Sequence, residues 1–232
     1  MLPAVFLTVF FTAVLFVARA VRGKARGELD EFRKTRSRCG LSGAEVARRI
    51  LHCGGAATVE VVDAGPGELN RYLPRVKKLE LDRATYHSHS LTAMALASRA
   101  ATQAIQHREN YPPFLWRREA VRLNRAAVLI AMIAFAAVLA ARLGNFHLLA
   151  VATVIGWTGL VILNLFTLPV EWDANKRALQ YLTADRLIAR DSGERDDLGA
   201  LLAAAAWHDS AAILDSFTSP FGPIKRMFRG RP

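Results

Sequence analysis

Met1–Ala18 (MLPAVFLTVFFTAVLFVA) contains no charged residue, and the same is true of Ala126–Ala141 and Leu148–Leu168. A helix needs roughly 20 apolar residues to cross a hydrocarbon layer of ~30 Å, with about 17 the usual minimum. The first and third stretches are long enough, and the second is flanked by arginines whose stems can snorkel toward the headgroups. These stretches therefore predict a mainly α membrane protein with three transmembrane helices, of which the last two form a hairpin.

Lys and Arg residues predict the orientation of these helices. The chain holds 31 basic and 20 acidic residues, a net charge of +11, and the basic residues crowd directly after the first apolar stretch. The positive-inside rule then predicts a multi-pass protein of the inner or plasma membrane, with the N-terminus outside, the main domain in the cytoplasm and the lipid bilayer as a partner. A cleavable signal peptide is the alternative for the first stretch, although no basic residue precedes it. A further apolar stretch, Leu198–Leu214, fits an amphipathic or buried helix at the cytoplasmic face better than a crossing.

Local signals predict helices and a small sheet in the water-facing part. Ser42 and Glu45 have the spacing of a capping box at the start of a helix. Two segments of strand composition follow, separated by Gly and Pro turns, and predict a small β-hairpin within a two- or three-stranded sheet. The predicted helices are 42–51, 90–107 and 169 to about 190, and the predicted strands are 58–62 and 76–81.

Several kinds of functional site are excluded or weakly indicated. No glycine cluster has the placement of a phosphate loop, and no nucleophile elbow is present. Cys39 and Cys53 are too few for a disulfide framework. The basic residues are dispersed with few aromatics between them, so nucleic acid is not an expected partner. His87 and His89 have a spacing that can bind a metal. Two histidines without an acidic or thiol partner nearby are only weak evidence for a metal site.

Five pieces of the sequence, taken in order, carry a family resemblance. They are SGAEVARRIL (42–51), YLPR (72–75), SLTAMALA (90–97), QAIQH (103–107) and TLPVEWDAN (167–175). Together they closely resemble the bacterial membrane family of putative neutral zinc metallopeptidases, from about residue 40 to about 215. The last piece is the most specific, because the family has Thr-Leu-Pro-Val-Glu-Phe-Asp-Ala-Ser there. The resemblance implies a zincin-like helical domain.

The zinc motif of that family is altered in this chain. Zinc hydrolysis needs two histidines one helical turn apart, a third ligand and an open position for water, and a glutamate beside the first histidine takes the proton of the water. Aligned without gaps, the positions of the family's His-Glu-x-x-His motif hold Arg99, Ala100 and Gln103 at the first histidine, the glutamate and the second histidine. Only Glu171, at the third-ligand position, is retained, with Asp173 beside it.

The resemblance therefore implies a metallopeptidase-like protein that is catalytically inactive, a pseudoenzyme with no catalytic residue and no expected cofactor, acting as a scaffold or partner subunit. Its expected partners are an active metallopeptidase paralogue or peptide and protein clients. One alternative is an active zinc enzyme with a non-standard metal site, drawn from His87, His89, His107 and Glu171. Another is a membrane structural protein unrelated to proteolysis.

The apolar stretches and the resemblance together predict four regions. They are an anchor (1–20), a cytoplasmic metallopeptidase-like domain (21–125), the transmembrane hairpin (126–168), and cytoplasmic helices with a basic tail that complete the domain (169–232).

One contact is predicted for the degenerate site. Without zinc, a buried Glu171 needs another counter-charge, and Arg99 carries a permanent positive charge at the first-ligand position. We therefore expect an Arg99–Glu171 or Arg99–Asp173 contact, with Gln103 donating to the remaining carboxylate oxygen. The alternative interpretation has Arg99 in water and Glu171 capping its own helix.

Overall fold

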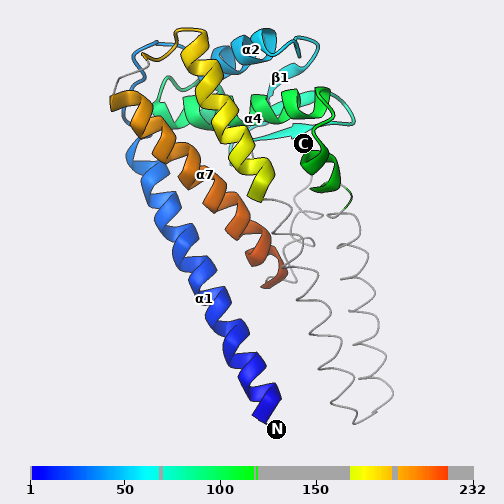
Figure 1. Cartoon of the computed structure of the whole chain (residues 1–232). Helices are drawn as coiled ribbons and strands as arrows, with labels where there is room; N and C mark the ends of the chain where they lie inside the picture. The colour runs from blue at the N-terminus through cyan, green and yellow to red at the C-terminus, as the bar shows by residue number, and fades with distance from the viewer. Residues whose placement is uncertain (1, 68–69, 118, 120–167, 190–192, 219–232) are drawn as a thin grey trace.

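The computed structural model describes residues 2–67, 70–117, 119, 168–189 and 193–218. The described chain is mainly helical, with one small sheet (Figure 1). Two long helices, α1 (Leu2–Glu31) and α7 (Gly193–Thr218), run side by side below the part that holds the sheet. The helical character and the small sheet agree with the sequence prediction.

Helix α2 (Gly43–Cys53) begins as the sequence predicts. The Ser42 hydroxyl accepts from the Glu45 N–H at 3.4 Å, and the Glu45 carboxylate accepts from the Ser42 N–H at 2.7 Å. This reciprocal pair is a capping box, and it satisfies two donors that the helix cannot satisfy within itself. The hydrogen bond from the Ser42 backbone lowers the pKa of Glu45.

We expect Ser42→Ala to lower the free energy of unfolding by about 1 kcal/mol, because it removes the acceptor of the capping box. Ser42→Thr keeps that acceptor and is the matched control. Urea denaturation of both variants measures the difference. Equal stabilities for the two variants would contradict the assignment of the cap.

The three strands form a sheet in the order β1-β3-β2. They are β1 (Glu60–Asp63), β2 (Arg71–Leu73) and β3 (Lys78–Leu81). The prediction of a hairpin between 58–62 and 76–81 is wrong, because β1 pairs with β3 in parallel. The chain between them is long enough to form β2, which pairs with β3 in antiparallel register and makes the hairpin. Lys77, with φ 50°, lies in the turn of that hairpin.

The next two helices follow the sheet. Helix α3 (Arg83–His87) is short, and α4 (Leu91–Arg108) is the long helix predicted at 90–107, with Ser90 as its N-cap. Most of α4 is buried, including a run of small residues that lets neighbouring helices approach closely. The helix predicted from Pro169 is present over 168–184.

The end of the helix 168–184 has the hydrogen-bond pattern of a Schellman motif. The Leu187 N–H donates to the Leu182 carbonyl at 3.0 Å, and the Arg186 N–H donates to the Thr183 carbonyl at 3.2 Å. Arg186 is the left-handed residue of this motif, with φ 55°. Glycine is the usual residue at this position, so an arginine here is unusual.

The prediction of three transmembrane helices requires correction. Within the described ranges, no helix combines the length and the apolar composition that a bilayer crossing requires. The apolar run at the N-terminus is only the first part of α1, and the helix continues through a charged second half to Glu31. In this second half, Ala25 and Leu29 pack into the core. The predicted hairpin lies, up to residue 167, outside the described residues. The boundaries at 20, 125 and 168 remain predictions.

The stretch 198–214 lies within α7, a single helix from Gly193 to Thr218. Its residues Leu198, Leu201 and Leu202 are fully buried and join the same core as α1, α2 and α4. The expectation of a buried helix is confirmed for this part of the stretch.

Candidate functional site

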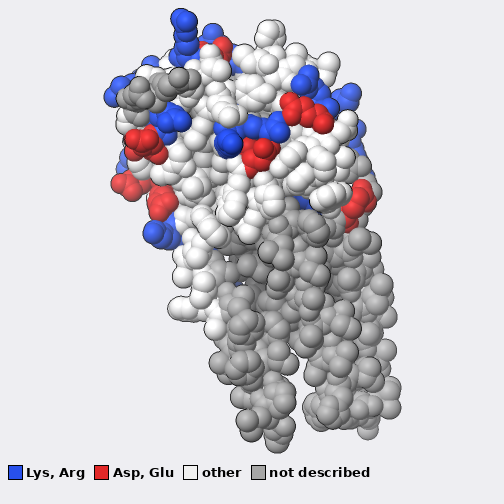
Figure 2. Space-filling view, viewed as in Figure 1, with Lys and Arg blue, Asp and Glu red and all other residues white. Residues whose placement is uncertain are grey.

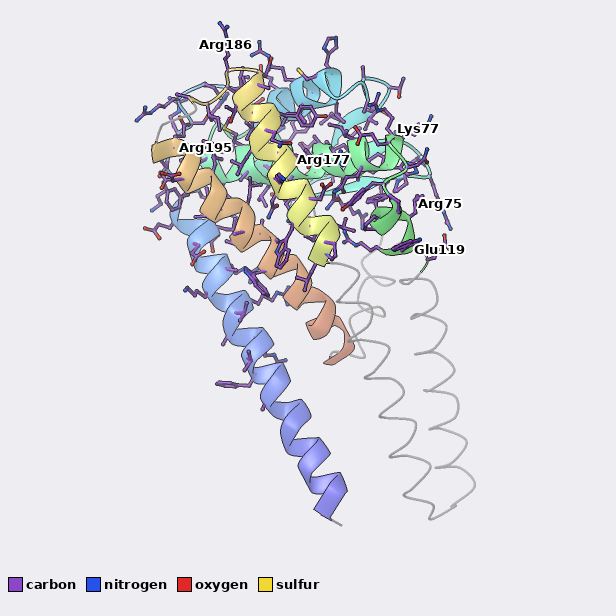
Figure 3. All side chains as sticks on the ribbon, viewed as in Figure 1. Arg75, Lys77, Glu119, Arg177, Arg186 and Arg195 are labelled. Atoms are coloured by element: carbon purple, nitrogen blue, oxygen red, sulfur yellow. The ribbon has the colours of Figure 1, made fainter. Side chains whose placement is uncertain are left out.

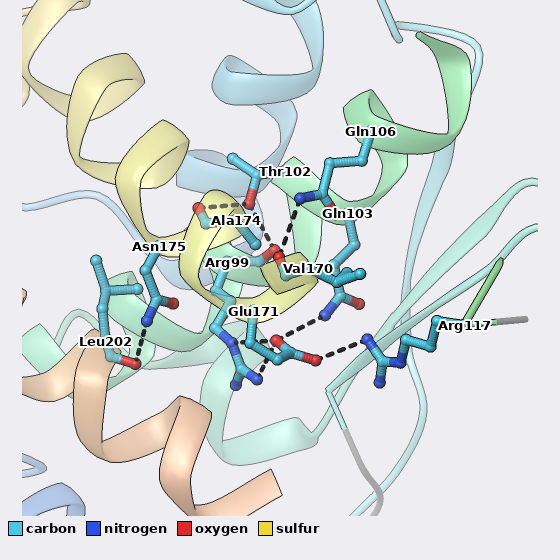
Figure 4. Close-up of polar contacts among 10 residues, drawn as sticks. All are labelled: Arg99, Thr102, Gln103, Gln106, Arg117, Val170, Glu171, Ala174, Asn175 and Leu202. Carbon is cyan, nitrogen blue, oxygen red and sulfur yellow. Dashed lines mark hydrogen bonds and ion pairs between the residues drawn. The ribbon is translucent and has the colours of Figure 1, made fainter. Parts of the chain in front are cut away.

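Glu171 lies in the first turn of the described part of the helix 168–184 and faces α4, which carries Arg99 (Figure 4). Its exposed fraction is 0%, and that of Arg99 is 4%. The Arg99 guanidinium donates to Glu171 Oε2 from Nε at 3.0 Å and from Nη2 at 2.5 Å. The predicted Arg99–Glu171 contact is therefore confirmed. The alternative interpretation, with Arg99 in water, is wrong.

The second oxygen of Glu171 is bound by an arginine that the sequence interpretation did not assign to the site. Arg117 Nη1 lies 2.7 Å from Glu171 Oε1, and its side chain is 24% exposed. Gln103 does contact the carboxylate, at 3.4 Å, but on Oε2, the oxygen that Arg99 already binds. The prediction that Gln103 takes the remaining oxygen is wrong, because Arg117 occupies it.

Asp173 belongs to a neighbouring network rather than to the Arg99 contact. Its Oδ2 accepts from Gln106 Nε2 at 2.7 Å and from Arg177 Nε at 2.5 Å. Arg177 also pairs with Glu109 and lies over the Tyr111 ring, 5.4 Å from its centroid. Burial alone would lower the pKa of Arg177, but the hydrogen bond to Glu109 and the charge of Asp173 raise it above its ordinary value. This guanidinium therefore stays charged.

Three side-chain amides and hydroxyls fix the helix 168–184 between α4 and α7 (Figure 4). Thr102 donates to the Ala174 carbonyl at 3.1 Å, and Gln106 donates to the Val170 carbonyl at 3.1 Å. On the other side, Asn175 donates to the Leu202 carbonyl at 2.9 Å. These bonds hold Glu171 at a set distance from α4.

The side chains at the degenerate motif do not fit a zinc ion. An arginine keeps its proton and has no lone pair to give, so Arg99 and Arg117 cannot be ligands. Both oxygens of Glu171 accept from these guanidinium groups. Ala100, at the position of the general base, is 3% exposed and packs into the core. The arrangement stabilises a buried carboxylate.

The histidines of the alternative metal site are held in three separate contacts. His87 Nε2 lies 3.2 Å from Asp63 Oδ2, His89 Nδ1 lies 2.9 Å from the Gly40 carbonyl, and His107 Nδ1 lies 3.1 Å from the Tyr72 hydroxyl. Among the residues that the structure describes, no group of three or more His, Cys, Asp or Glu side chains is close enough to hold a metal ion. The structure therefore does not bring this ligand set together.

Arg117 could not have been found from local sequence signals. It stands among basic residues before an apolar stretch, which favours an interpretation as a membrane-flanking charge. Its contact with Glu171 joins residues 54 apart in sequence. Only the tertiary arrangement of α4, the helical residues 112–117 and the helix 168–184 brings the two together.

Comparison with known proteins identifies the family. Residues 6–219 match the family described as "Putative neutral zinc metallopeptidase". The "Putative membrane protease YugP" of Bacillus subtilis (strain 168) is 28% identical over 213 residues, which cover 92% of each chain. No solved structure matches this chain. The family match includes both α4 and the helix 168–184, and the chain belongs to the putative neutral zinc metallopeptidase family, as its sequence motifs predicted.

Proposed function

We propose that this protein is a non-catalytic member of its family, which acts as a scaffold or partner subunit instead of cleaving peptides. The observation that carries the proposal is the double engagement of Glu171 by Arg99 and Arg117. A peptidase of this family would need that carboxylate to face a metal ion. Here its negative charge is already compensated by two guanidinium groups.

The energetics of the Arg99–Glu171 ion pair oppose the binding of a zinc ion to Glu171. A buried carboxylate without a partner is unfavourable by several kcal/mol, so Glu171 and Arg99 hold each other in place. A zinc ion would have to displace a guanidinium that makes two hydrogen bonds to the same oxygen. Displacement would also break the hydrogen bonds between Arg99 and Glu171 in a position where Arg99 is only 4% exposed.

The expected partners follow from the family. An active member with an intact His-Glu-x-x-His motif, or a peptide client of such an enzyme, is the partner that a scaffold of this kind would bind. A neighbouring reading frame that encodes an active member would support this pairing. For the location of the protein we propose a membrane, and the support is that the Bacillus subtilis relative is named a putative membrane protease.

We expect purified protein to contain less than about 0.1 zinc per chain after dialysis, because three ligands are the usual minimum for a catalytic zinc site. It should also cleave no casein-like substrate. Metal analysis and a fluorogenic casein assay measure the two quantities, with an active peptidase of the family as the positive control. Stoichiometric zinc, or chelator-sensitive cleavage that is abolished by Glu171→Gln, would overturn the proposal.

A further inference from the structure

A cleft separate from the Glu171 site lies beside the second half of the helix 168–184, the turn that follows it and the start of α7. Its volume is about 770 Å³, within the range of roughly 300–1,000 Å³ that is usual for ligand sites. Apolar groups from Leu179, Ala184, Ile188 and Ala189 contribute to its wall. A cleft of this size with an apolar wall can receive side chains of a binding partner.

Three basic side chains, Lys176, Arg186 and Arg195, also line the cleft, and all three are exposed. Over the ranges that the structure describes, none of them forms an ion pair. Asp185, the acidic neighbour of Arg186, is already paired with Arg49 at 3.1 Å. Figure 2 shows basic side chains at the top and upper left of this face, where the helix 168–184 ends and α7 begins.

Acidic residues beside Arg195 in sequence do not line the cleft. Successive residues of a helix point about 100° apart, so the neighbours of Arg195 face other directions. Glu194 shows this, since its carboxylate accepts from the Arg38 backbone N–H at 2.9 Å. The described lining of the cleft thus holds basic and apolar residues together with two uncharged polar ones, Gln180 and Thr183, and no acidic residue.

Arg186 adds a second, independent observation. It holds the left-handed position of the Schellman motif, where a side chain with a Cβ is unfavourable compared with glycine. Folding alone would favour glycine there. Residues kept in unfavourable backbone conformations are concentrated at functional sites, and this one places a guanidinium at the edge of the cleft.

We propose that this cleft binds an acidic peptide segment, with carboxylates on its basic residues and an apolar side chain on its wall. The basic residues are spread out: Lys176 lies about 12 Å along the helix axis from residue 184 at ~1.5 Å per residue. An extended peptide spans that length with about four residues. A small anion would need the three charges to converge on one point, yet Arg186 and Arg195 stand apart in Figure 3.

This proposal goes beyond the inactive Glu171 site and holds whether or not the chain cleaves peptides. The probe is a fluorescein-labelled octapeptide of alternating Glu and Leu, with binding measured by fluorescence anisotropy in about 0.1 M salt, where the screening length is about 10 Å. Arg186→Gly should weaken binding about threefold, as expected for one exposed charge pair. The triple variant K176Q/R186G/R195Q should weaken it by about 30-fold if the three charges act independently.

Lys77→Gly is the matched control. It removes the same charge from a residue with the same backbone conformation, φ 50°, at the opposite side of the domain (Figure 3). The control for the triple variant is K34Q/R75Q/K77G. Both controls should bind the peptide as the unmodified chain does. Arg186→Gly should also raise the melting temperature by about 2 °C, because glycine suits the left-handed position, so lost binding cannot reflect lost folding.

Three results would overturn the proposal. The first is equal loss of affinity in Arg186→Gly and Lys77→Gly, which would mean attraction to the net charge of the whole chain. The second is equal binding of the peptide with Gln in place of Glu. The third is binding to phosphatidylglycerol vesicles that is lost in the triple variant while peptide binding is unchanged, which would assign the cleft to lipid.

Discussion

Replacing Arg99 with alanine is expected to lower the free energy of unfolding by about 3 kcal/mol, the lower end of the range for breaking a buried ion pair. The variant leaves Glu171 buried and removes the two hydrogen bonds that Arg99 donates to Oε2, so that only the longer one from Gln103 remains on that oxygen among the contacts described. The loss stays at the lower end because Arg117 still neutralises Oε1. Urea denaturation followed by circular dichroism measures the change.

Arg71→Ala is the matched control for this result. Arg71 binds Glu80 at 2.8 Å, a similar distance, but its side chain is 46% exposed. Solvent screens that pair, so its loss should lower stability by less than about 1 kcal/mol. Replacing Arg99 and Glu171 together by Met and Leu should recover most of the stability, because both fully buried charges are then removed and Arg117, which loses Glu171, is 24% exposed to water. Equal effects of the two single alanine variants would contradict the buried pair.

Restoring imidazoles at the two degenerate positions is expected to recover zinc binding, from less than about 0.1 to about one ion per chain, because three protein ligands then meet the usual count. The variant is R99H/Q103H. Arg99 and Gln103 both reach Glu171 Oε2, so side chains at these positions converge on one carboxylate oxygen. Metal analysis and competition with a zinc chelator measure stoichiometry and affinity.

Arg117 is expected to weaken the binding of zinc to the R99H/Q103H variant. Its guanidinium binds Oε1 of the same carboxylate and would repel a divalent ion held by Oε2. Coulomb's law gives about 1.7 kcal/mol for a unit charge ~5 Å from Zn²⁺ in water, so R99H/Q103H/R117Q should bind zinc at least about tenfold more tightly than R99H/Q103H. Arg108→Gln is the control, since Arg108 contacts the Gly55 carbonyl instead. Zinc binding that needs no histidine would contradict the geometry.

The parts of the fold that the sequence predicts well depend on contacts within one helical turn. The capping box of Ser42 and Glu45 and the N-cap of Ser90 are such contacts, and each begins a helix where expected. The pairing of β1 with β3 depends on how distant segments meet, and strand composition does not encode it. The prediction of a transmembrane helix over the N-terminal apolar run was wrong for a related reason. Apolar composition alone does not specify where α1 ends or which helices it packs against.

The contacts of the candidate site likewise include some that the sequence predicted and some that it did not. Arg99 and Glu171 were paired from a charge argument on aligned motif positions, which supplied the long-range proximity that composition lacks. No aligned motif includes Arg117, so nothing related it to Glu171 before the structure. Asp173 was identified as a neighbour only by its place in the sequence, and its partners Gln106 and Arg177 became evident only from the packing of α4 against the helix 168–184.

The packing of α1 against α7 has a consequence for synthesis of the protein. Ala25 and Leu29 of the first helix share a core with Leu198 and Leu202 of the last described helix. The ribosome makes α1 before α7, so the face of α1 that packs on α7 stays uncovered while the roughly 160 residues between the two helices are translated. A premature stop codon anywhere before Gly193 would remove the partner of a helix that has already been made, and the truncated chain would present that face to chaperones and proteases.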